Sequence, residues 1–268
     1  MSKEDKLVKL KEIVQHMRSV AVAFSGGVDS TLLLKVAHEV LGDKVIAVTS
    51  ASETFASWEE REAVALANII GVRIRFVHSK EMEDDCFVNN PPDRCYYCKK
   101  SLFAEIRRIA EGEGIAEIAD GNNADDLQHH RPGKKASEEM GVRSPLAEAG
   151  LTKNEIRSIS REMGLRTADK PQNACLASRI PYDEKITLEK LVMIETAEDR
   201  LRSLGLAQLR VRHHGLIARI EVPEEAIEIV AKKRGEIVRA LKDVGFIYVT
   251  LDLEGFRSGS MLDAVRHG

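Results

Sequence analysis

Residues 20–35 read VAVAFSGGVDSTLLLK, and this stretch decides the fold. An apolar run from Val20 to Phe24 stops at Ser25-Gly26-Gly27, and a second apolar run begins at Leu32. The pattern predicts a buried strand, a glycine turn and a helix. Such a turn points backbone N–H groups at one spot, and the helix N-terminus adds a partial positive charge. The stretch therefore predicts an anion site, with phosphate as the expected anion.

The residues of the turn support this interpretation and exclude two common alternatives. Gly26 and Gly27 allow close backbone approach and positive φ, and Ser25 and Ser30 can donate hydrogen bonds. The turn is not a Walker A loop, because no lysine follows the glycines until Lys35. It also lacks the G-x-G-x-x-G dinucleotide fingerprint. The remaining alternative is a plain strand-to-helix turn that binds nothing.

The first two-thirds of the chain alternates between strand and helix patterns, which favours an α/β fold with a parallel sheet and helices on both faces. Ligands of such sheets bind at the carboxyl ends of the strands, where the Ser25 turn lies. The expected strands are 20–24, 45–49, 74–78 and 117–120, and the expected helices are 30–41, 57–70 and 99–112.

The pattern changes in the last third. Residues 151–165 predict one more helix, with Thr152 as N-cap and Glu155 completing a capping box. An irregular stretch, 166–185, follows. We then expect a helix at 188–204, strands at 208–213 and 217–222, a helical stretch at 224–244 and a strand at 246–251. This order predicts a small α+β domain, so we place the domains at 1–180 and 181–268.

Composition narrows the function classes. The chain has 268 residues, a formal net charge of −3 and 4% aromatic residues, so neither charge nor aromatic content indicates a nucleic-acid partner. No apolar run approaches the about 18 residues of a membrane span. The N-terminal MSKEDKLVKLKEIV is charged and helical in period, unlike a signal peptide. We therefore expect a cytoplasmic protein with no membrane partner.

Four cysteines in that compartment are more typical of metal binding, catalysis or packing than of disulfides. Cys95 and Cys98 form one C-x-x-C, which alone is compatible with zinc, iron–sulfur, redox chemistry or no function. Cys86 is expected to be inert. Cys175 lies in a loop next to Arg179, and a nearby cation favours the reactive thiolate. Cys175 is thus a candidate nucleophile, with a structural cysteine as the alternative.

The string SGGVDS at 25–30 resembles the PP-loop of the N-type ATP pyrophosphatases, such as GMP synthetase and several tRNA thiolases. The resemblance implies ATP cleavage between the α- and β-phosphates, with AMP transferred to a substrate oxygen. It implies that Asp29 is the Mg²⁺-associated carboxylate. The implied ATP contacts are Ser25, Gly26, Gly27, Val28, Asp29, Ser30, Ser50, Gly121 and Asp125.

Several of these residues have simpler alternative roles. Asp125 and Asp126 follow the strand ending near Gly121, and they either position ATP or its Mg²⁺ or cap a helix. Ser50 either lines the nucleotide pocket or merely ends a strand.

Arg210 and Arg212 alternate along one strand, so both side chains lie on one face. Two guanidinium groups on one face suit a phosphate. The alternative is a solvated strand face with salt bridges. Three carboxylates are candidate partners of these arginines or candidate ligands of a metal: Glu198, Glu221 and Asp252.

A closer resemblance covers nearly the whole chain. The loop ACLASRIPY, the stretch from DGNNADD to KNEIR and the segment RVRHHGLIARIEV are similar to the LarE family. This family consists of ATP-dependent sulfur transferases that help build the nickel-pincer nucleotide cofactor of lactate racemase. The implied substrate is pyridinium-3,5-biscarboxylic acid mononucleotide, one carboxylate of which becomes a thiocarboxylate. A homo-oligomer is also implied, with a hexamer as the candidate assembly.

The family resemblance assigns roles to further residues. Cys175 matches the sulfur-donating cysteine, which some members sacrifice to dehydroalanine. In other members three cysteines hold a [4Fe–4S] cluster, and Cys95, Cys98 and Cys175 favour that form here. The substrate phosphate is expected to contact Ser178, Arg179, Arg210 and Arg212.

One position departs from the family. Many members have an acidic residue where this chain has Gln128-His129-His130. Two alternative functions stay open at this point: a tRNA thiolase of the same superfamily, and a nucleotide-binding assembly protein without catalysis. The SGGVDS turn and the loop cysteine argue against the second.

Overall fold

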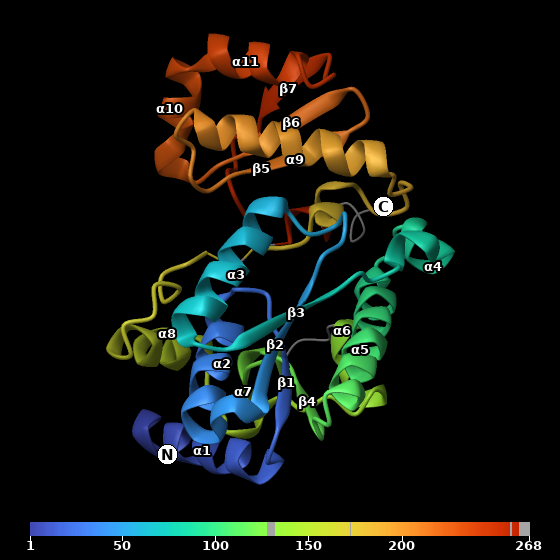
Figure 1. Ribbon diagram of the computed structural model, residues 1–268. Coiled ribbons are helices and arrows are strands. Elements are labelled where there is room, and N and C mark those ends of the chain that lie inside the picture. The colour runs from blue at the N-terminus through green and yellow to red at the C-terminus, as the bar shows by residue number, and fades with distance from the viewer. Residues whose placement is uncertain (128–131, 172, 258, 263–268) are drawn as a thin grey trace. The chain divides into compact units, whose positions relative to one another are not determined.

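The structure is a computed structural model, and it describes residues 1–127, 132–171, 173–257 and 259–262 (Figure 1). The chain forms two compact units. Unit 1 comprises Met1–Glu81 and Asp93–Asn173. Unit 2 comprises Met82–Pro92 and the chain from Ala174 onwards. The chain passes from unit 1 to unit 2 after Asn173, whereas the expected domain boundary was at 180. The sequence pattern did not predict that residues 82–92 belong to unit 2.

Unit 1 is built on a four-stranded sheet of order β3-β2-β1-β4 in which every pair is parallel. The strands are β1 (Val20–Ala23), β2 (Val45–Ser50), β3 (Arg73–Val77) and β4 (Glu117–Ala119). The expected α/β fold with a parallel sheet is confirmed.

Helices cover both faces of this sheet (Figure 1). Val20 and Val22 of β1 belong to one apolar cluster, and Ala21 between them belongs to another. Successive side chains of a strand point to opposite faces, so a strand buried on both faces contributes to two cores. The unit 1 helices are α1 (Lys3–Met17), α2 (Val28–Leu41), α3 (Ser57–Ile70), α5 (Arg94–Gly112), α6 (Pro132–Glu139), α7 (Pro145–Glu148) and α8 (Lys153–Glu162).

Two helix starts matter for the candidate site. Helix α8 begins where the capping box predicts, because the Thr152 side chain accepts a hydrogen bond from Glu155 N and the Glu155 carboxylate accepts one from Thr152 N. Helix α5 begins at Arg94, five residues before its expected start. Cys95 and Cys98 therefore lie in the first two turns of a helix rather than before it.

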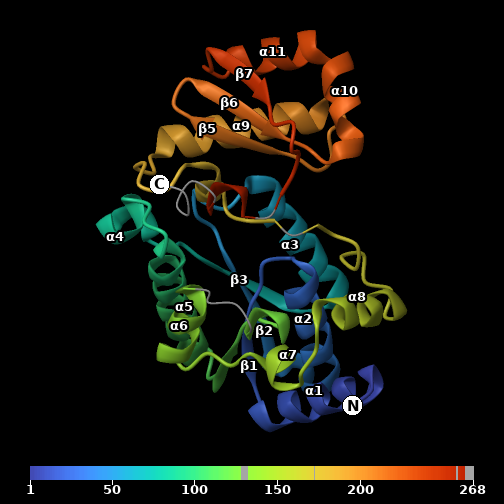
Figure 2. The ribbon, with the colours of Figure 1, turned by 180° about the vertical axis from the view of Figure 1, so that it is seen from behind.

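Unit 2 is the expected small α+β unit (Figure 2). Its sheet has the order β5-β6-β7, antiparallel between the first two strands and parallel between the last two. The expected helical stretch 224–244 is broken at Lys233, whose ψ of 11° departs from helical geometry. The elements are α4 (Asp85–Val88), α9 (Leu188–Ser203), β5 (Arg210–His214), β6 (Ile217–Glu221), α10 (Ile227–Lys232), α11 (Arg234–Lys242) and β7 (Tyr248–Leu251).

Within the described ranges, no helix combines the length and the apolar character that crossing a membrane requires.

Candidate active site

The serine-glycine turn joins β1 to α2 at the carboxyl end of the central strands. Helix α2 starts at Val28, and its N-cap residue Gly27 provides no side-chain cap. Gly26 has a φ of +65°, a conformation that favours glycine. The first-turn N–H groups of a helix have no partner within the helix, so they can bind an anion at the N-terminal end of α2.

Hydroxyl groups line the turn. Ser25 Oγ and Ser30 Oγ lie 3.2 Å apart, and Ser30 Oγ donates to Gly27 O at 3.2 Å. A Cβ added to Gly121 would lie 3.0 Å from Ser30 N, so the chain after β4 packs directly against the start of α2. The predicted ATP contacts Ser25, Ser30 and Gly121 are therefore adjacent in the structure. A side chain larger than glycine at position 121 would collide with the start of α2.

Asp29 lies in a polar network that joins the turn to the segment after β4. Its carboxylate forms an ion pair with Lys153 Nζ and accepts a hydrogen bond from Asn123 Nδ2 at 3.3 Å. Asp125 Oδ2 accepts a hydrogen bond from Lys153 N at 2.8 Å. The helix-capping role considered for Asp125 is thus present. Asp126 is also placed near this network, through a hydrogen bond from Asn123 N at 3.1 Å.

Sequence reasoning missed two lysines at the turn. Lys153 is the first residue of α8, and Lys170 Nζ donates to Gly26 O at 2.9 Å. Both lysines lie more than 100 residues beyond the turn in the chain, whereas a Walker A loop has its lysine directly after the glycines. The predicted capping box located Lys153 at a helix start, but nothing in the local pattern placed that helix beside the turn.

Ser50 lies at the end of β2, and its hydroxyl is 2.9 Å from that of Ser79, which follows β3. Its side chain is partly exposed. The strand-ending role is therefore present in the structure, and the partial exposure is compatible with a place beside the nucleotide.

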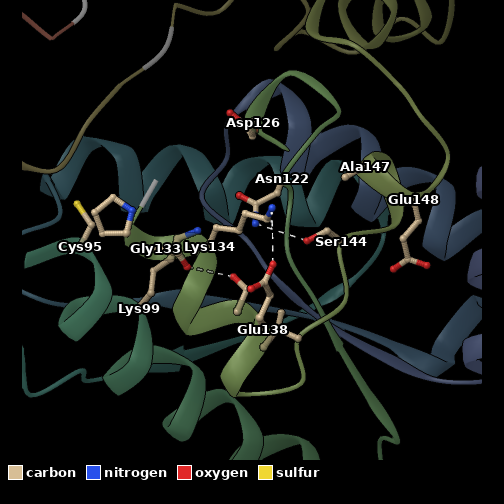
Figure 3. A pocket seen from close by; sticks show the side chains of 13 residues that line it. Cys95, Lys99, Asn122, Asp126, Gly133, Lys134, Glu138, Ser144, Ala147 and Glu148 are labelled. Carbon is tan, nitrogen blue, oxygen red and sulfur yellow. Dashed lines mark hydrogen bonds and ion pairs between the residues drawn. The ribbon is translucent and has the colours of Figure 1, made fainter. Parts of the chain in front are cut away.

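A cavity of about 460 Å³ lies in unit 1 between the segment after β4 and helices α5, α6 and α7. Asn122 and Lys134 reach into it, with Cys95 at one end and Glu148 at the other (Figure 3). One wall is fixed by the buried Asp120 carboxylate, which accepts hydrogen bonds from the hydroxyls of Ser137 and Ser144 at 2.9 and 2.7 Å.

The cysteines are divided between the units. Cys95 is exposed and Cys98 partly exposed, and their i, i+3 spacing in α5 puts both on one helix face. Cys175 belongs to unit 2 and is partly exposed, directly before the short 3₁₀ turn η4 (Leu176–Arg179). Cys86 is exposed in α4.

No group of three or more His, Cys, Asp or Glu side chains among the described residues is arranged to hold a metal ion. The three-cysteine cluster therefore stays a prediction. Gln128, His129 and His130, the departure from the family pattern, lie outside the described residues.

Arg179 holds the Cys175 segment to the core of unit 2. Its guanidinium group donates to both carboxylate oxygens of Glu198, at 2.8 and 3.1 Å, and to the carbonyl oxygens of Ala174 and Cys175. Burial opposes ionisation of Glu198, but Arg179, with Arg202 and Val211 N–H, outweighs it and lowers the pKa of the carboxyl. Arg179 thus fixes the backbone on either side of the thiol.

Arg212 is also committed to protein partners. Its side chain is 2% exposed and donates to Ser178 O at 2.8 Å, to Glu221 Oε2 at 2.7 Å and to Ser260 Oγ at 2.9 Å. Of the three carboxylates considered as partners of Arg210 and Arg212, only Glu221 pairs with one of them, Arg212, among the described residues. Glu198 pairs instead with Arg179 and Arg202. The third, Asp252, is paired with Arg219, whose guanidinium lies 3.7 Å from it.

Arg210 differs from its neighbours. The residue is 7% exposed, yet its side chain makes no hydrogen bond or ion pair with any residue that the structure describes. Its guanidinium carbon lies 4.4 Å from the Phe256 ring centroid. Burial, together with the nearby Arg212 and Arg179 charges, lowers the pKa of Arg210 to about 10. Arg210 and Arg212 are both buried, so the alternative of a solvated strand face with salt bridges does not describe this strand. Its unused donors make Arg210 the side chain in this cluster best suited to bind an anion.

The parallel sheet with the SGGVDS turn at the carboxyl end of β1 is the arrangement expected of the PP-loop ATP pyrophosphatases. No family model matches the chain. The chain is 28% identical, over 58% of its length and 52% of the relative's, to a tRNA-specific 2-thiouridylase from Rickettsia africae.

Similarity over the full length is more specific. The chain is 44% identical to an uncharacterised protein from Synechocystis, over 96% of this chain and 97% of the relative. It is 41% identical to pyridinium-3,5-bisthiocarboxylic acid mononucleotide synthase from Lactiplantibacillus plantarum, over 97% of this chain and 95% of the relative. The chain therefore belongs to the LarE family. It is an enzyme of that family, an ATP-dependent sulfurtransferase.

Proposed function

We propose that this enzyme uses ATP to activate a carboxylate of pyridinium-3,5-biscarboxylic acid mononucleotide and converts it to a thiocarboxylate. The observation that carries the proposal is the anion-binding turn at residues 25–30, with Lys153 and Asp29 paired beside it. The substrate assignment is supported by the 41% identity to a synthase named for the corresponding bisthiocarboxylic acid. The product would be a precursor of a nickel-pincer nucleotide such as the cofactor of lactate racemase.

In the activation step, N–H groups of the turn and the hydroxyls of Ser25 and Ser30 bind the phosphates that leave as pyrophosphate. Asp29 would hold Mg²⁺, which would neutralise phosphate charge. Lys153 then exchanges its ion pair with Asp29 for one with a phosphate oxygen, so the total charge of the site stays balanced. A substrate carboxylate oxygen forms a bond to the α-phosphorus, the bond to the bridging oxygen breaks, and pyrophosphate leaves.

In the transfer step, the Cys175 thiolate attacks the carbonyl carbon of the acyl adenylate and AMP leaves with the electron pair of the broken C–O bond. The product is a thioester. Removal of the Cys175 α-proton then breaks the Cβ–S bond, which leaves dehydroalanine in the chain and a thiocarboxylate on the substrate. The Arg179 contacts with the carbonyl groups of residues 174 and 175 support this role, because they fix the backbone that carries the thiol.

The second route, which the presence of three cysteines favours, takes sulfur from a [4Fe–4S] cluster held by Cys95, Cys98 and Cys175. Two thiols at i and i+3 near the start of α5 lie on one helix face and could supply two ligands on one side of such a group. The cluster would supply sulfide, and Cys175 would stay intact.

Arg210 is the proposed contact for the substrate phosphate. It is a buried cation whose side-chain donors have no described protein partner, whereas Arg179 and Arg212 already hold carboxylates. The nearby positive charges of Arg179 and Arg212 disfavour an isolated Arg210 cation, and a bound phosphate would offset them. Ser178 lies in η4, where its carbonyl oxygen accepts from Arg212 and its hydroxyl accepts from Arg179 at 3.2 Å.

The deciding experiment is intact-mass spectrometry of anaerobically purified, cluster-reconstituted enzyme after reaction with ATP, Mg²⁺ and the pyridinium dicarboxylate nucleotide. Product with loss of one H₂S at Cys175 would establish the sacrificial route. Product with an unchanged chain mass would establish cluster-borne sulfide. Pyrophosphate release without product would retain the ATP site and reject the substrate.

The tRNA thiolase remains the second candidate because of the partial match to a 2-thiouridylase. That match covers about half of each chain, whereas the match to the pyridinium nucleotide synthase covers nearly all of both. A filter-binding titration with total tRNA at several salt concentrations separates the two functions. Salt-dependent binding in the micromolar range or tighter would favour the thiolase, and no binding would exclude it.

A further inference from the structure

We propose that Lys170 is a positioning residue for ATP: it fixes the orientation of the Gly26–Gly27 peptide in the phosphate-binding turn. The inference rests on the proposed function only in taking ATP as the ligand of this turn. Nothing in the SGGVDS motif points to Lys170, which lies more than 140 residues further along the chain.

Lys170 makes a well-defined set of contacts within unit 1. Its ammonium group donates to Gly26 O at 2.9 Å and to Glu62 Oε2 at 2.7 Å, and it lies 5.7 Å from the centroid of the Trp58 ring. The side chain is 13% exposed. Glu62 and Trp58 both belong to α3, so the lysine joins the turn to a helix that packs on the sheet. A carbonyl held by a buried charged group is held more tightly than one facing water.

The geometry of the peptide bond transmits this contact to the ligand side. All described peptide bonds are trans, so the Gly26 carbonyl and the Gly27 N–H point in opposite directions. With the carbonyl held against Lys170, the Gly27 N–H points the other way and donates to Ser25 Oγ at 3.4 Å. Two successive glycines have little intrinsic preference for this orientation, because glycine adopts many φ and ψ values. Lys170 holds the carbonyl side of this peptide, and the longer hydrogen bond to Ser25 Oγ holds its N–H side.

Lys170 is itself held in place by α8. The Arg157 guanidinium group donates to Ala168 O at 2.6 Å and to Lys170 O at 2.9 Å. Lys153, one helical turn before Arg157, pairs with Asp29. The turn is therefore held near both ends, at Gly26 and at Asp29, by one helix and the segment that follows it. This arrangement suits a device that keeps backbone donors in place before ATP binds.

Three variants test the role. Lys170→Met removes the charge at similar length, Lys170→Arg keeps a charged donor, and Lys35→Met is the control. Lys35 lies on α2 and pairs only with Glu39, at 3.3 Å, among the described residues. Binding of α,β-methylene-ATP and of inorganic pyrophosphate is measured by calorimetry, and binding of adenosine by ligand-observed NMR. Thermal unfolding verifies that each variant is folded.

For Lys170→Met we expect affinity for the ATP analogue and for pyrophosphate to fall about tenfold, while adenosine affinity stays unchanged. Lys170→Arg should recover part of the loss, and Lys35→Met should match wild type. Equal loss for adenosine and pyrophosphate would mean that Lys170 only supports the fold and would overturn the proposal, as would unchanged pyrophosphate affinity. If Lys170→Met does not fold, Glu62→Gln replaces it, with a smaller loss of the same selectivity expected. Failure of the wild type to bind the ATP analogue would instead reject the proposed function.

Discussion

Gly26 requires a backbone conformation that other residues adopt only with strain. Its φ is +65°, and an added Cβ would lie 3.4 Å from Ala63. Gly26→Ala should cost about 1–2 kcal/mol of stability and abolish most ATP-dependent pyrophosphate release, because the turn must change shape. Gly42→Ala is the matched control: its φ is +59°, but open space surrounds the added Cβ. It should lose similar stability and keep full activity. Equal activity in both variants would contradict a role for the turn.

Arg210 and Arg212 should respond oppositely to the same substitution. Arg212→Met leaves the buried Glu221 carboxylate without its main partner and should destabilise the protein by about 3 kcal/mol in urea unfolding. Arg210→Met removes a buried charge that has no described protein partner, so stability should stay the same or rise. Substrate affinity should nevertheless fall at least tenfold, measured by calorimetry with the mononucleotide. Large destabilisation by Arg210→Met would show that its charge is needed by the fold.

Among single residues, the sequence predicts the role of those whose partners are near neighbours in the chain. Gly26, Ser30 and Asp29 fall within one six-residue motif, and the structure places them together. Lys153 and Lys170 reach the same turn through tertiary packing, and no local spacing marks them. The commitment of Arg179 to Glu198 was likewise unpredictable, because it depends on how η4 packs against α9.

The N-terminus of helix α8 places Lys153 beside the phosphate-binding turn. Thr152→Ala removes the capping hydrogen bond and should cost about 1 kcal/mol. Because Lys153 is the first residue of the helix, fraying there should also raise the KM for ATP severalfold. Ser2→Ala is the matched control, since Ser2 and Asp5 form the same capping box on α1. It should lower stability without changing the KM for ATP. If both variants leave the KM unchanged, the start of α8 does not position a nucleotide ligand.

Elements with a strong apolar period were the ones that the sequence predicted well. Strands β1 and β2 are buried on both faces, so nearly every residue in them is apolar. The start of α5 was missed because cysteine and tyrosine have weak helix propensity. Short helices such as α7 carry too few residues for a period to be recognised.

The division of the whole molecule was the least predictable feature. A sequence pattern can place one boundary along the chain, but Met82–Pro92 leaves unit 1 and joins unit 2. There the Asn90 side chain donates to Pro181 O at 2.6 Å, and Ile186 N donates to Val88 O at 2.8 Å. These contacts join segments about 100 residues apart, which local periodicity cannot detect.

Acid should lower the free energy of unfolding through two histidines of unit 2, His213 and His214. Burial lowers the pKa of His213 and His214 below the ordinary 6.5, with Lys190 and Arg219 adding to the effect. Both histidines are neutral in the folded and unfolded chain above that pH, and below it only the unfolded chain takes up their protons readily. Stability is therefore complete above pH 6.5 and falls as the pH drops, by at most about 1.4 kcal/mol per pH unit for each histidine.

Glu198 acts in the same direction at lower pH. The pKa of its carboxyl is lowered, so its stabilising effect is present above the ordinary 4.5 and is lost as the pH falls further. Urea unfolding followed by circular dichroism between pH 8 and 5 isolates the histidine contribution, because Glu198 titrates below that window. The His213→Phe/His214→Phe double variant should flatten the profile between pH 6.5 and 5. An equally steep profile in the double variant would place the acid-sensitive groups elsewhere in the molecule.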